Sequence, residues 1–174
     1  VALPYSSGTT GLPKGVMLTH HNLVANMCQC EPLLPTTAAD TIVAVLPFYH
    51  IYGMVVIMDG GLLHGATIVT MPRFDLEGFL RIVQDHGVTR ANLVPPIILA
   101  LAKHPVVDNY DLSKLASIGS GAAPLGDDLE QACAERLSCT VRQGYGLTET
   151  SPVTHALRLD QSRPGSVGQC LPNT

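Results

Sequence analysis

Apolar and polar positions follow two patterns along this chain of 174 residues. Short runs made almost wholly of apolar residues, and stopped by proline or glycine, predict buried strands. We expect such strands at residues 41–46, 66–71, 91–94 and 115–118, and a further strand at residues 140–143. Runs with an apolar helical face, or apolar nearly throughout, predict helices at residues 20–31, 51–63, 76–86, 97–103 and 125–137. Because strands and helices alternate, the pattern predicts an α/β fold with a largely parallel sheet and flanking helices.

Cap and stop residues set several of these boundaries. Thr19 and Asp75 each offer a side-chain oxygen to the first free amides of the helix that follows. Gly87 is typical of a helix stop, because glycine adopts the left-handed conformation without a steric cost. Pro95 and Pro96 suit the first turn of a helix, because N–H groups in that turn have no acceptor within the helix and proline loses nothing by lacking one.

The segment from Tyr5 to Gly15 carries five hydroxyl-bearing side chains, three glycines and one lysine. Glycines let a ligand approach backbone amides that form an anion-binding concavity, and Ser, Thr and Lys add donors. This composition predicts a loop that holds a phosphate chain, delivered by a strand end at the apolar residues 1–3. The loop is not a Walker A motif, because Lys14 precedes a glycine instead of following one. A flexible turn without a ligand is the alternative.

Three other candidate residues come directly after predicted strands. They are His50, Gly121 and Tyr145. In a parallel sheet the carboxyl ends of the strands meet at one edge, where ligands bind. We therefore expect these residues and the phosphate loop to share one cleft. A dinucleotide-binding fingerprint is not supported, because Pro124 occupies its sixth position.

Residues 6–16 resemble the signature loop of the adenylate-forming superfamily, which includes acyl-CoA synthetases, luciferases and the adenylation domains of peptide synthetases. Four later segments resemble further motifs of the superfamily in the same order, at residues 46–53, 119–125, 144–149 and 164–168. The resemblance covers essentially the whole chain and is closest to 4-coumarate–CoA ligases and their near relatives. It implies the central segment of the large N-terminal domain of such an enzyme.

The resemblance also implies a domain plan. Residues 1–174 would be a partial adenylation (AMP-binding) domain, in which residues 1–36 end a first α/β subdomain and residues 37–174 form a second. The C-terminal lid domain of relatives would be absent, and so would the region that precedes the phosphate loop. We expect those N- and C-terminal parts to pack on this segment, which alone should have little or no ligase turnover.

Individual residues take roles by the same resemblance. The catalytic set would be Lys14, His50, Thr148 and Glu149, with Glu149 as the ligand of Mg²⁺. The nucleotide-binding set would be Ser6, Ser7, Gly8, Thr9, Thr10, Gly11, Lys14, Gly121, Ala122, Ala123, Pro124, Gln143, Gly144, Tyr145, Gly146 and Thr148. The acid-binding set would be His50, Tyr52, Gly121, Gly146, Pro152 and Val153.

These roles suit the side chains. A hydroxyl such as that of Thr148 can donate to an α-phosphate oxygen, and the ring of Tyr145 can pack on adenine. The imidazole of His50 can orient a carboxylate, and Tyr52 matches the position that meets the phenol end of hydroxycinnamates. Plainer interpretations are a solvated lysine at 14, a core histidine at 50 and a helix-start pair at 148–149.

The implied function is the ATP-dependent activation of a hydroxycinnamate-like acid to an acyl-adenylate and then an acyl-CoA. The small molecules involved would be the carboxylic acid, ATP, Mg²⁺ and coenzyme A as co-substrate. A medium-chain fatty acyl-CoA synthetase and a luciferase-like enzyme are alternatives within the same chemistry. A non-catalytic nucleotide-binding fragment is the alternative outside it.

Composition and charge bear on the partners of the protein, on membrane spans and on its compartment. The net charge of −4 with no basic run argues against a nucleic-acid partner. The longest apolar run, Met54–Met58, is too short to span a membrane, and we expect no signal peptide. Five cysteines without a C-x-x-C spacing favour a reducing cytoplasm over a disulfide framework. Cys28 and Cys30 could be metal ligands, but buried free thiols are the better interpretation.

Overall fold

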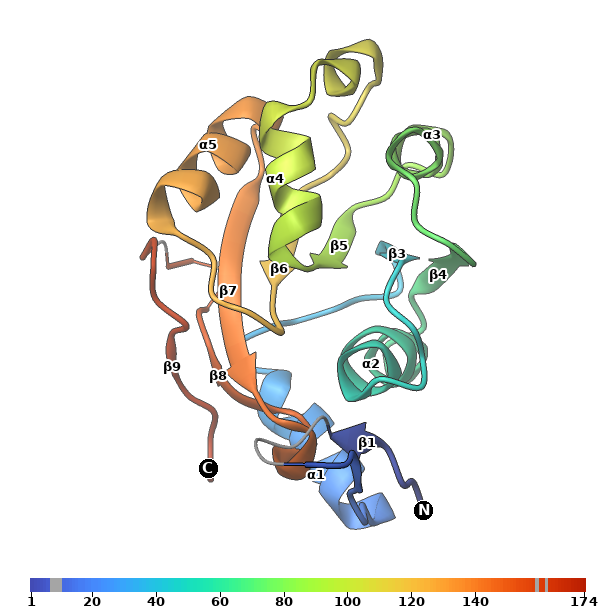
Figure 1. The fold of residues 1–174 in the computed structure, drawn as a ribbon, viewed down its shortest axis with the longest axis vertical. Coiled ribbons are helices and arrows are strands. Elements are labelled where there is room, and N and C mark those ends of the chain that lie inside the picture. Colours follow the sequence, from blue (N-terminus) through green and yellow to red (C-terminus); the bar gives the residue numbers. More distant parts are fainter. Residues whose placement is uncertain (7–10, 159, 162) are drawn as a thin grey trace.

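The computed structural model describes residues 1–6, 11–158, 160–161 and 163–174. Its main sheet has seven strands in the order β4-β3-β5-β6-β7-β8-β9 (Figure 1). The strands are β3 (Thr41–Ala44), β4 (Thr67–Thr70), β5 (Arg90–Leu93), β6 (Ser117–Ser120), β7 (Thr140–Gly146), β8 (Val153–Ala156) and β9 (Gln169–Cys170). The first five in this order run parallel, and β8 and β9 are antiparallel additions at one edge. The expected α/β class with a largely parallel sheet is confirmed.

Helices cover both faces of this sheet. They are α1 (His20–Cys30), the π-helix η1 (Tyr52–Asp59), α2 (Gly60–Leu63), α3 (Leu76–Asp85), α4 (Pro95–Lys103), the 3₁₀ turn η2 (Pro105–Asn109), α5 (Asp127–Leu137) and the 3₁₀ turn η3 (Thr148–Thr150). In Figure 1, α4 and α5 lie together over β6 and β7, whereas α1 and α2 lie at the opposite end of the molecule with β1. The chain thus forms layers around the sheet.

The main core lies between the sheet and the helices α3, α4 and α5. Phe79, Leu93, Ile98 and Leu101 are all fully buried there. Strand side chains alternate between faces, so Ala91 and Leu93 point into this core while their neighbours point to the opposite face. Smaller clusters join η1 to α1 and to β3 on that opposite face.

The predicted caps are confirmed. The Asn22 amide donates to Thr19 Oγ1 at 3.1 Å and the Thr19 amide donates to Asn22 Oδ1 at 3.1 Å, which closes a capping box. The Gly78 amide donates to Asp75 Oδ1 at 2.7 Å. Gly87 has a φ of +57°, the left-handed conformation expected at a helix stop.

The elements differ from the expectation in three places. Residues 51–63 form a π-helix followed by one turn of α-helix, a distinction that a run of apolar residues cannot make. The strand expected at 140–143 continues to Gly146, so Tyr145 lies in a strand and not in the loop after it. The antiparallel strands β8 and β9 were not predicted, because residues 151–170 show no apolar run of strand length.

The phosphate-loop segment is also delivered differently from the expectation. A separate antiparallel hairpin, β1 (Tyr5–Ser6) paired with β2 (Lys14–Gly15), holds its two ends. Ala2 forms only an isolated bridge with Leu18, so residues 1–3 add no strand to the main sheet. The loop residues Ser7, Gly8, Thr9 and Thr10 lie outside the described residues. The subdomain boundary after residue 36 stays a prediction.

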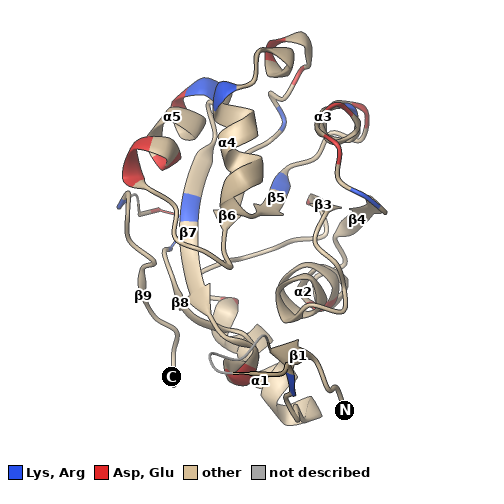
Figure 2. Cartoon of the chain, viewed as in Figure 1, with Lys and Arg blue, Asp and Glu red and all other residues tan. Residues whose placement is uncertain are grey.

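Charged residues are unevenly spread. Figure 2 shows acidic and basic residues along α3 and α5 and few on the ribbons around α2 and β1. Within the sheet, β5 and β7 each carry one basic residue, Arg90 and Arg142. Within the described ranges, every helix is too short or too polar to cross a lipid bilayer.

Candidate functional site

A cleft of about 780 Å³ opens at the carboxyl ends of β6 and β7. Its other walls are the hairpin β1–β2, the start of η1 and the turn η3. The predicted site residues that line it are Ser6, Lys14, His50, Tyr52, Gly121, Ala122, Gln143, Gly144, Tyr145, Gly146, Thr148, Glu149, Pro152 and Val153. Gly11, Ala123 and Pro124 are exposed and lie outside the lining. The structure therefore brings the phosphate-loop hairpin and the 148–149 pair into one cleft.

The hairpin wall presents a lysine and a serine to this cleft. Ser6 pairs with Lys14 across the two strands, and β1 contacts η3. Lys14 is exposed, whereas Ser6 Oγ is buried and has no hydrogen-bond partner among the described residues. A buried hydroxyl in a wall of the cleft is an available donor for an anionic ligand.

The wall at residues 147–152 is a tight turn closed by its own backbone. The Leu147 amide donates to Thr150 Oγ1 at 3.0 Å and to the Pro152 carbonyl at 3.1 Å. Ser151 adopts a φ of +75°, which reverses the chain into β8. The turn holds Thr148, half-buried, and Glu149, exposed, at the lip of the cleft.

His50 has a defined ring orientation. The Tyr52 amide donates to His50 Nδ1 at 3.2 Å, so Nδ1 acts as an acceptor. In the neutral imidazole the other nitrogen, Nε2, then carries the proton and is a donor. Because His50 lines the cleft, this N–H is available to a carboxylate oxygen.

The Tyr52 side chain makes its contacts within the protein. Its hydroxyl donates to the Gly119 carbonyl at 3.2 Å, and burial raises the pKa of the phenol above its ordinary value. Its ring packs against Gly121, where a Cβ would lie 2.8 Å from Tyr52 Cε1. Glycine is therefore required at 121 for this ring position. A ligand can meet the Tyr52 oxygen only as a donor, because its proton is already used.

Gln143 uses its side chain as an internal clamp. Its Oε1 accepts from the Leu125 amide at 2.9 Å, and its Nε2 donates to the Leu125 carbonyl at 2.9 Å and to Glu130 Oε2 at 2.7 Å. The side chain ties β7 to the start of α5, which uses both N–H donors of its amide and leaves only the second lone pair of Oε1 for the predicted nucleotide contact. Sequence reasoning missed Glu130, a buried acid in an otherwise solvated helix start.

Tyr145 offers an open ring. It is 48% exposed, and the His155 ring meets it edge to face with centroids 6.0 Å apart. One aromatic neighbour at the edge leaves a π-face free for a flat ligand. His155 is the partner that supports this ring.

Several lining residues were missed by sequence reasoning. Asn26 of α1 is buried and forms two hydrogen bonds with the backbone of Val153, which fixes that wall of the cleft. The missed residues that line the cleft itself are Asn92, Ser120 and Arg142, whereas Asn26 supports it through Val153. The signal that could have found Arg142 is a charged residue inside a strand read as buried.

The described residues hold no group of three or more His, Cys, Asp or Glu side chains that could bind a metal alone. Glu149 is a single carboxylate in the cleft. This fits Mg²⁺ in the mode that uses one or two carboxylates together with the phosphate oxygens of a bound nucleotide.

Comparison with known proteins agrees with this geometry. The family model described as "AMP-binding enzyme" matches residues 1–174, and the chain belongs to this family. It is 49% identical over 158 residues to 4-coumarate–CoA ligase 1 of Petroselinum crispum, covering 88% of this chain and 29% of that protein. It is 41% identical over 175 residues to a probable 4-coumarate–CoA ligase 1 of Dictyostelium discoideum, covering 98% and 32%.

Solved structures are similar over nearly the whole chain. The crystal structure of ATP-bound MatB from Rhodopseudomonas palustris has a TM-score of 0.89 at 30% identity and covers 98% of this chain and 34% of its own. O-succinylbenzoate coenzyme A synthetase (MenE) from Bacillus subtilis, in complex with ATP and magnesium ion, has a TM-score of 0.85 at 30% identity and covers 98% and 35%. The chain spans 29% of the length of the ligases from Petroselinum crispum.

Proposed function

We propose that the protein containing this chain activates a hydroxycinnamate-like carboxylic acid with ATP and then transfers the acyl group to coenzyme A. In the first step a carboxylate oxygen attacks the α-phosphorus, forming an acyl-adenylate and releasing pyrophosphate. In the second, the thiol of coenzyme A displaces AMP. The observation that carries the proposal is the single cleft shared by the Ser6–Lys14 hairpin, His50 and the 148–149 turn.

Charge stabilisation is the main demand of the first step. We assign the β- and γ-phosphates to Lys14, Ser6 and the loop residues Ser7 to Gly11. Thr148 would donate its hydroxyl to the α-phosphate, and Glu149 would hold Mg²⁺ beside it. When bound, this ion neutralises phosphate charge as a Lewis acid.

The acid would be oriented by His50. Its Nε2–H, set by the bond from the Tyr52 amide to Nδ1, suits a carboxylate oxygen. Orientation matters because alignment of the two reacting groups supplies a large share of the barrier reduction. The body of the acid would then lie along Tyr52, Gly121, Gly146 and the Pro152–Val153 wall, which are all lining residues.

The adenine would lie against Tyr145, whose ring is partly exposed. Ala122, Gly144 and Gly146 would offer it a backbone wall with little side-chain bulk. Gln143 would contribute through its place in this wall, since its side chain is held by Leu125 and Glu130. Roles for Gly11, Ala123 and Pro124 remain predictions for residues outside the described lining.

We further propose a cytoplasmic protein in which additional chain covers part of this segment. The described cysteines are all free thiols, which suits a reducing compartment. Met17 and Tyr49 are 84% and 81% exposed. Leu3, just before the β1–β2 hairpin, and Leu12, between its two strands, are exposed as well. Large apolar side chains left open in this number favour cover by another part of the protein.

Carboxylate-dependent exchange of pyrophosphate into ATP, measured on the full-length protein, tests the proposal. We expect exchange with 4-coumarate, and a loss of about 100-fold or more in kcat for Lys14→Met and for Thr148→Val, because each removes a group that stabilises charge in the transition state. Glu149→Gln should raise the Mg²⁺ concentration needed for half-maximal exchange.

Lys114→Met is the matched control, because Lys114 is an exposed lysine outside the cleft. It should leave exchange unchanged. No exchange with any aryl or fatty acid would contradict the proposed function. A non-catalytic nucleotide-binding role predicts ATP binding sensitive to Lys14→Met but no exchange.

A further inference from the structure

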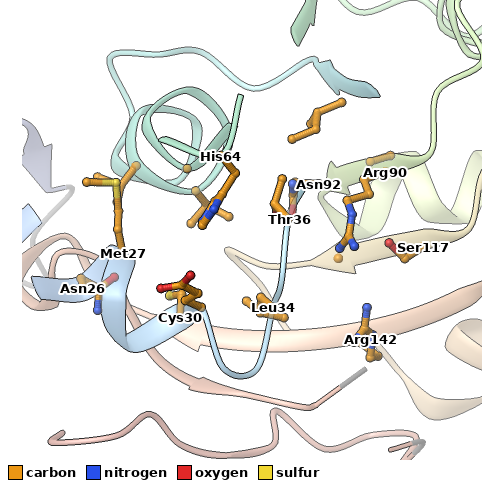
Figure 3. Close-up of a pocket in the computed structure, with 17 residues that line it drawn as sticks. Asn26, Met27, Cys30, Leu34, Thr36, His64, Arg90, Asn92, Ser117 and Arg142 are labelled. Carbon is orange, nitrogen blue, oxygen red and sulfur yellow. The ribbon is translucent and has the colours of Figure 1, made fainter. Parts of the chain in front are cut away.

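A second, smaller cavity of about 90 Å³ adjoins the cleft (Figure 3). The two share a boundary made of residues that line both: Leu34, Val56, Asn92, Gly119 and Arg142. A volume of this size holds a few water molecules or one small polar group. These shared residues, Arg142 among them, therefore border both the cleft and the smaller cavity.

Arg142 is the unusual residue at this boundary. It is only 6% exposed, yet its Nε and NH1 atoms have no hydrogen-bond partner among the described residues. Figure 3 shows its side chain rising from β7 toward the cavity. A buried guanidinium without a partner is costly, so a buried arginine normally meets an acceptor or a carboxylate.

The neighbouring charges do not compensate it. Arg90 of β5, which β6 separates from β7 in the sheet, points toward Arg142 in Figure 3. Its Nε lies 2.9 Å from Asp40 Oδ1, so that carboxylate is already paired. Burial, and then the positive charge of Arg90, lower the pKa of the Arg142 guanidinium. Within the described part of the chain, Arg142 forms no ion pair.

The other titratable groups around the cavity are Cys30, Glu31 and His64. Burial raises the pKa of the Cys30 thiol to about 12, so it carries no charge at neutral pH. Glu31 is exposed at the end of α1 and makes no salt bridge with Arg142. The cavity thus has an excess of positive charge at its floor.

The strand register fixes where this charge lies relative to the reacting end of the cleft. Arg142 pairs with Gly119, whose carbonyl accepts the Tyr52 hydroxyl. Gly146, near the 148–149 turn, is four residues further along β7, which corresponds to about 13 Å of extended strand. An acid with its carboxyl at His50 and its body along Tyr52 would direct its far end to Arg142.

We propose that the preferred acid carries a second carboxylate at the end distant from the one that is activated, and that Arg142 binds it. The inference rests on the proposed function and refines its substrate, with a carboxylate at the distal end of the acid in place of the hydroxyl of a hydroxycinnamate. A planar guanidinium in a small buried cavity matches a carboxylate, which it can bind through two parallel hydrogen bonds.

The test compares acids that differ only at the distal end. The full-length protein is assayed by pyrophosphate exchange with cinnamate, 4-coumarate and 4-carboxycinnamate, and with the pairs hexanoate and adipate, octanoate and suberate. We expect kcat/KM to be about 10- to 100-fold higher for the dicarboxylate than for its monocarboxylate counterpart in at least one series. Equal or lower values in every series would overturn the proposal.

Variants locate the effect. Arg142→Met should abolish the preference for the dicarboxylate while exchange with the monocarboxylate persists, and Arg142→Lys should retain part of it. Arg81→Met, an exposed arginine of α3 outside both cavities, is the control and should keep the full preference. A preference that survives Arg142→Met would overturn the assignment. So would an Arg142→Met protein that fails to fold while Arg142→Lys shows no preference.

Failure of the proposed function gives a different result. If no acid supports exchange, calorimetry of 4-carboxycinnamate and cinnamate on the full-length protein and on Arg142→Met still decides the inference. Binding of 4-carboxycinnamate about tenfold tighter than cinnamate, lost in Arg142→Met, supports it. Equal affinities, or binding unaffected by the substitution, overturn it.

Discussion

The two faces of the main sheet differ in what their side chains do. On the face toward α3, α4 and α5, Leu93 and Ile118 are fully buried in a continuous apolar core. On the other face, the next residues along the same strands are polar or lack a side chain, as at Asn92 and Gly119, and they border both cavities.

This difference shows how one set of strands can serve two purposes. Side chains alternate across a strand with a period of two, so each face can be selected separately. The closed face supplies the free energy of folding, because apolar side chains at close packing lose water and gain contacts. The open face keeps unpaired polar groups, which cost stability but can bind a ligand.

The largest effect is expected from a substitution in the closed face. Phe79→Ala should lower the free energy of unfolding by about 3–5 kcal/mol, because it leaves a cavity among fully buried neighbours. Val56→Ala, on the wall of both cavities, should cost under about 1 kcal/mol, since its surroundings are already open. Urea unfolding of the two variants measures this. Equal losses would mean that the faces do not differ in packing.

A smaller effect is expected at Gln143, which lines the cleft and bonds to the α5 region behind it. Gln143→Leu should lower the free energy of unfolding by about 2–3 kcal/mol, because it leaves the Leu125 amide and the Glu130 carboxylate without their bonds. Ser120→Ala is the matched control: Ser120 is also buried but has no described partner, so the change should lie within about 0.5 kcal/mol. A neutral Gln143→Leu would show that the clamp contributes nothing to stability.

The smallest expected effect concerns Asp40, at the edge of the open face. Burial raises its pKa, but hydrogen bonds from Thr37, Thr89 and Arg90 outweigh burial and hold the pKa below its ordinary value. A lowered pKa in the folded state stabilises the protein above the unfolded pKa of about 4, and that contribution is lost as the pH falls through the folded pKa.

Asp40→Asn should therefore lower the free energy of unfolding by about 1–2 kcal/mol at pH 7. The difference from the unsubstituted protein should shrink as the pH falls below about 4. Thermal or urea unfolding across this pH range measures it. Asp85→Asn, exposed at the end of α3, should change stability by under about 0.5 kcal/mol at either pH. A constant difference at all pH values would contradict the role of the Asp40 charge.

The sequence was sufficient for the parallel part of the fold. Short, mostly apolar runs predicted four of the five parallel strands, and the fifth was expected at residues 140–143. Thr19, Asp75 and Gly87 marked helix ends, because caps and stops depend on local chemistry. It was insufficient where partners distant in the chain decide the structure. Strands β1, β2 and β9 have only two residues each and are too short to show a period, and the four residues of β8 contain no apolar run.

The site was predictable in the same uneven way. Motif positions at strand ends led to His50, Tyr52 and the 148–149 pair, all of which line the cleft. The sequence could not say that the Gln143 side chain is held by α5, or that Arg142 is buried without a partner. Both facts depend on which side chains meet across the sheet, and no local pattern encodes that.

The clamp at Gln143 has a mechanical consequence. One side chain fastens both Leu125 and Glu130, so the turn that follows β6 cannot shift without loosening α5 from the sheet. The turn after β6 can therefore move only together with α5. A bulkier substrate must therefore gain its space at another wall. The β1–β2 hairpin pairs only two residues per strand and lies outside the main sheet, so changes in substrate size should be sought there first.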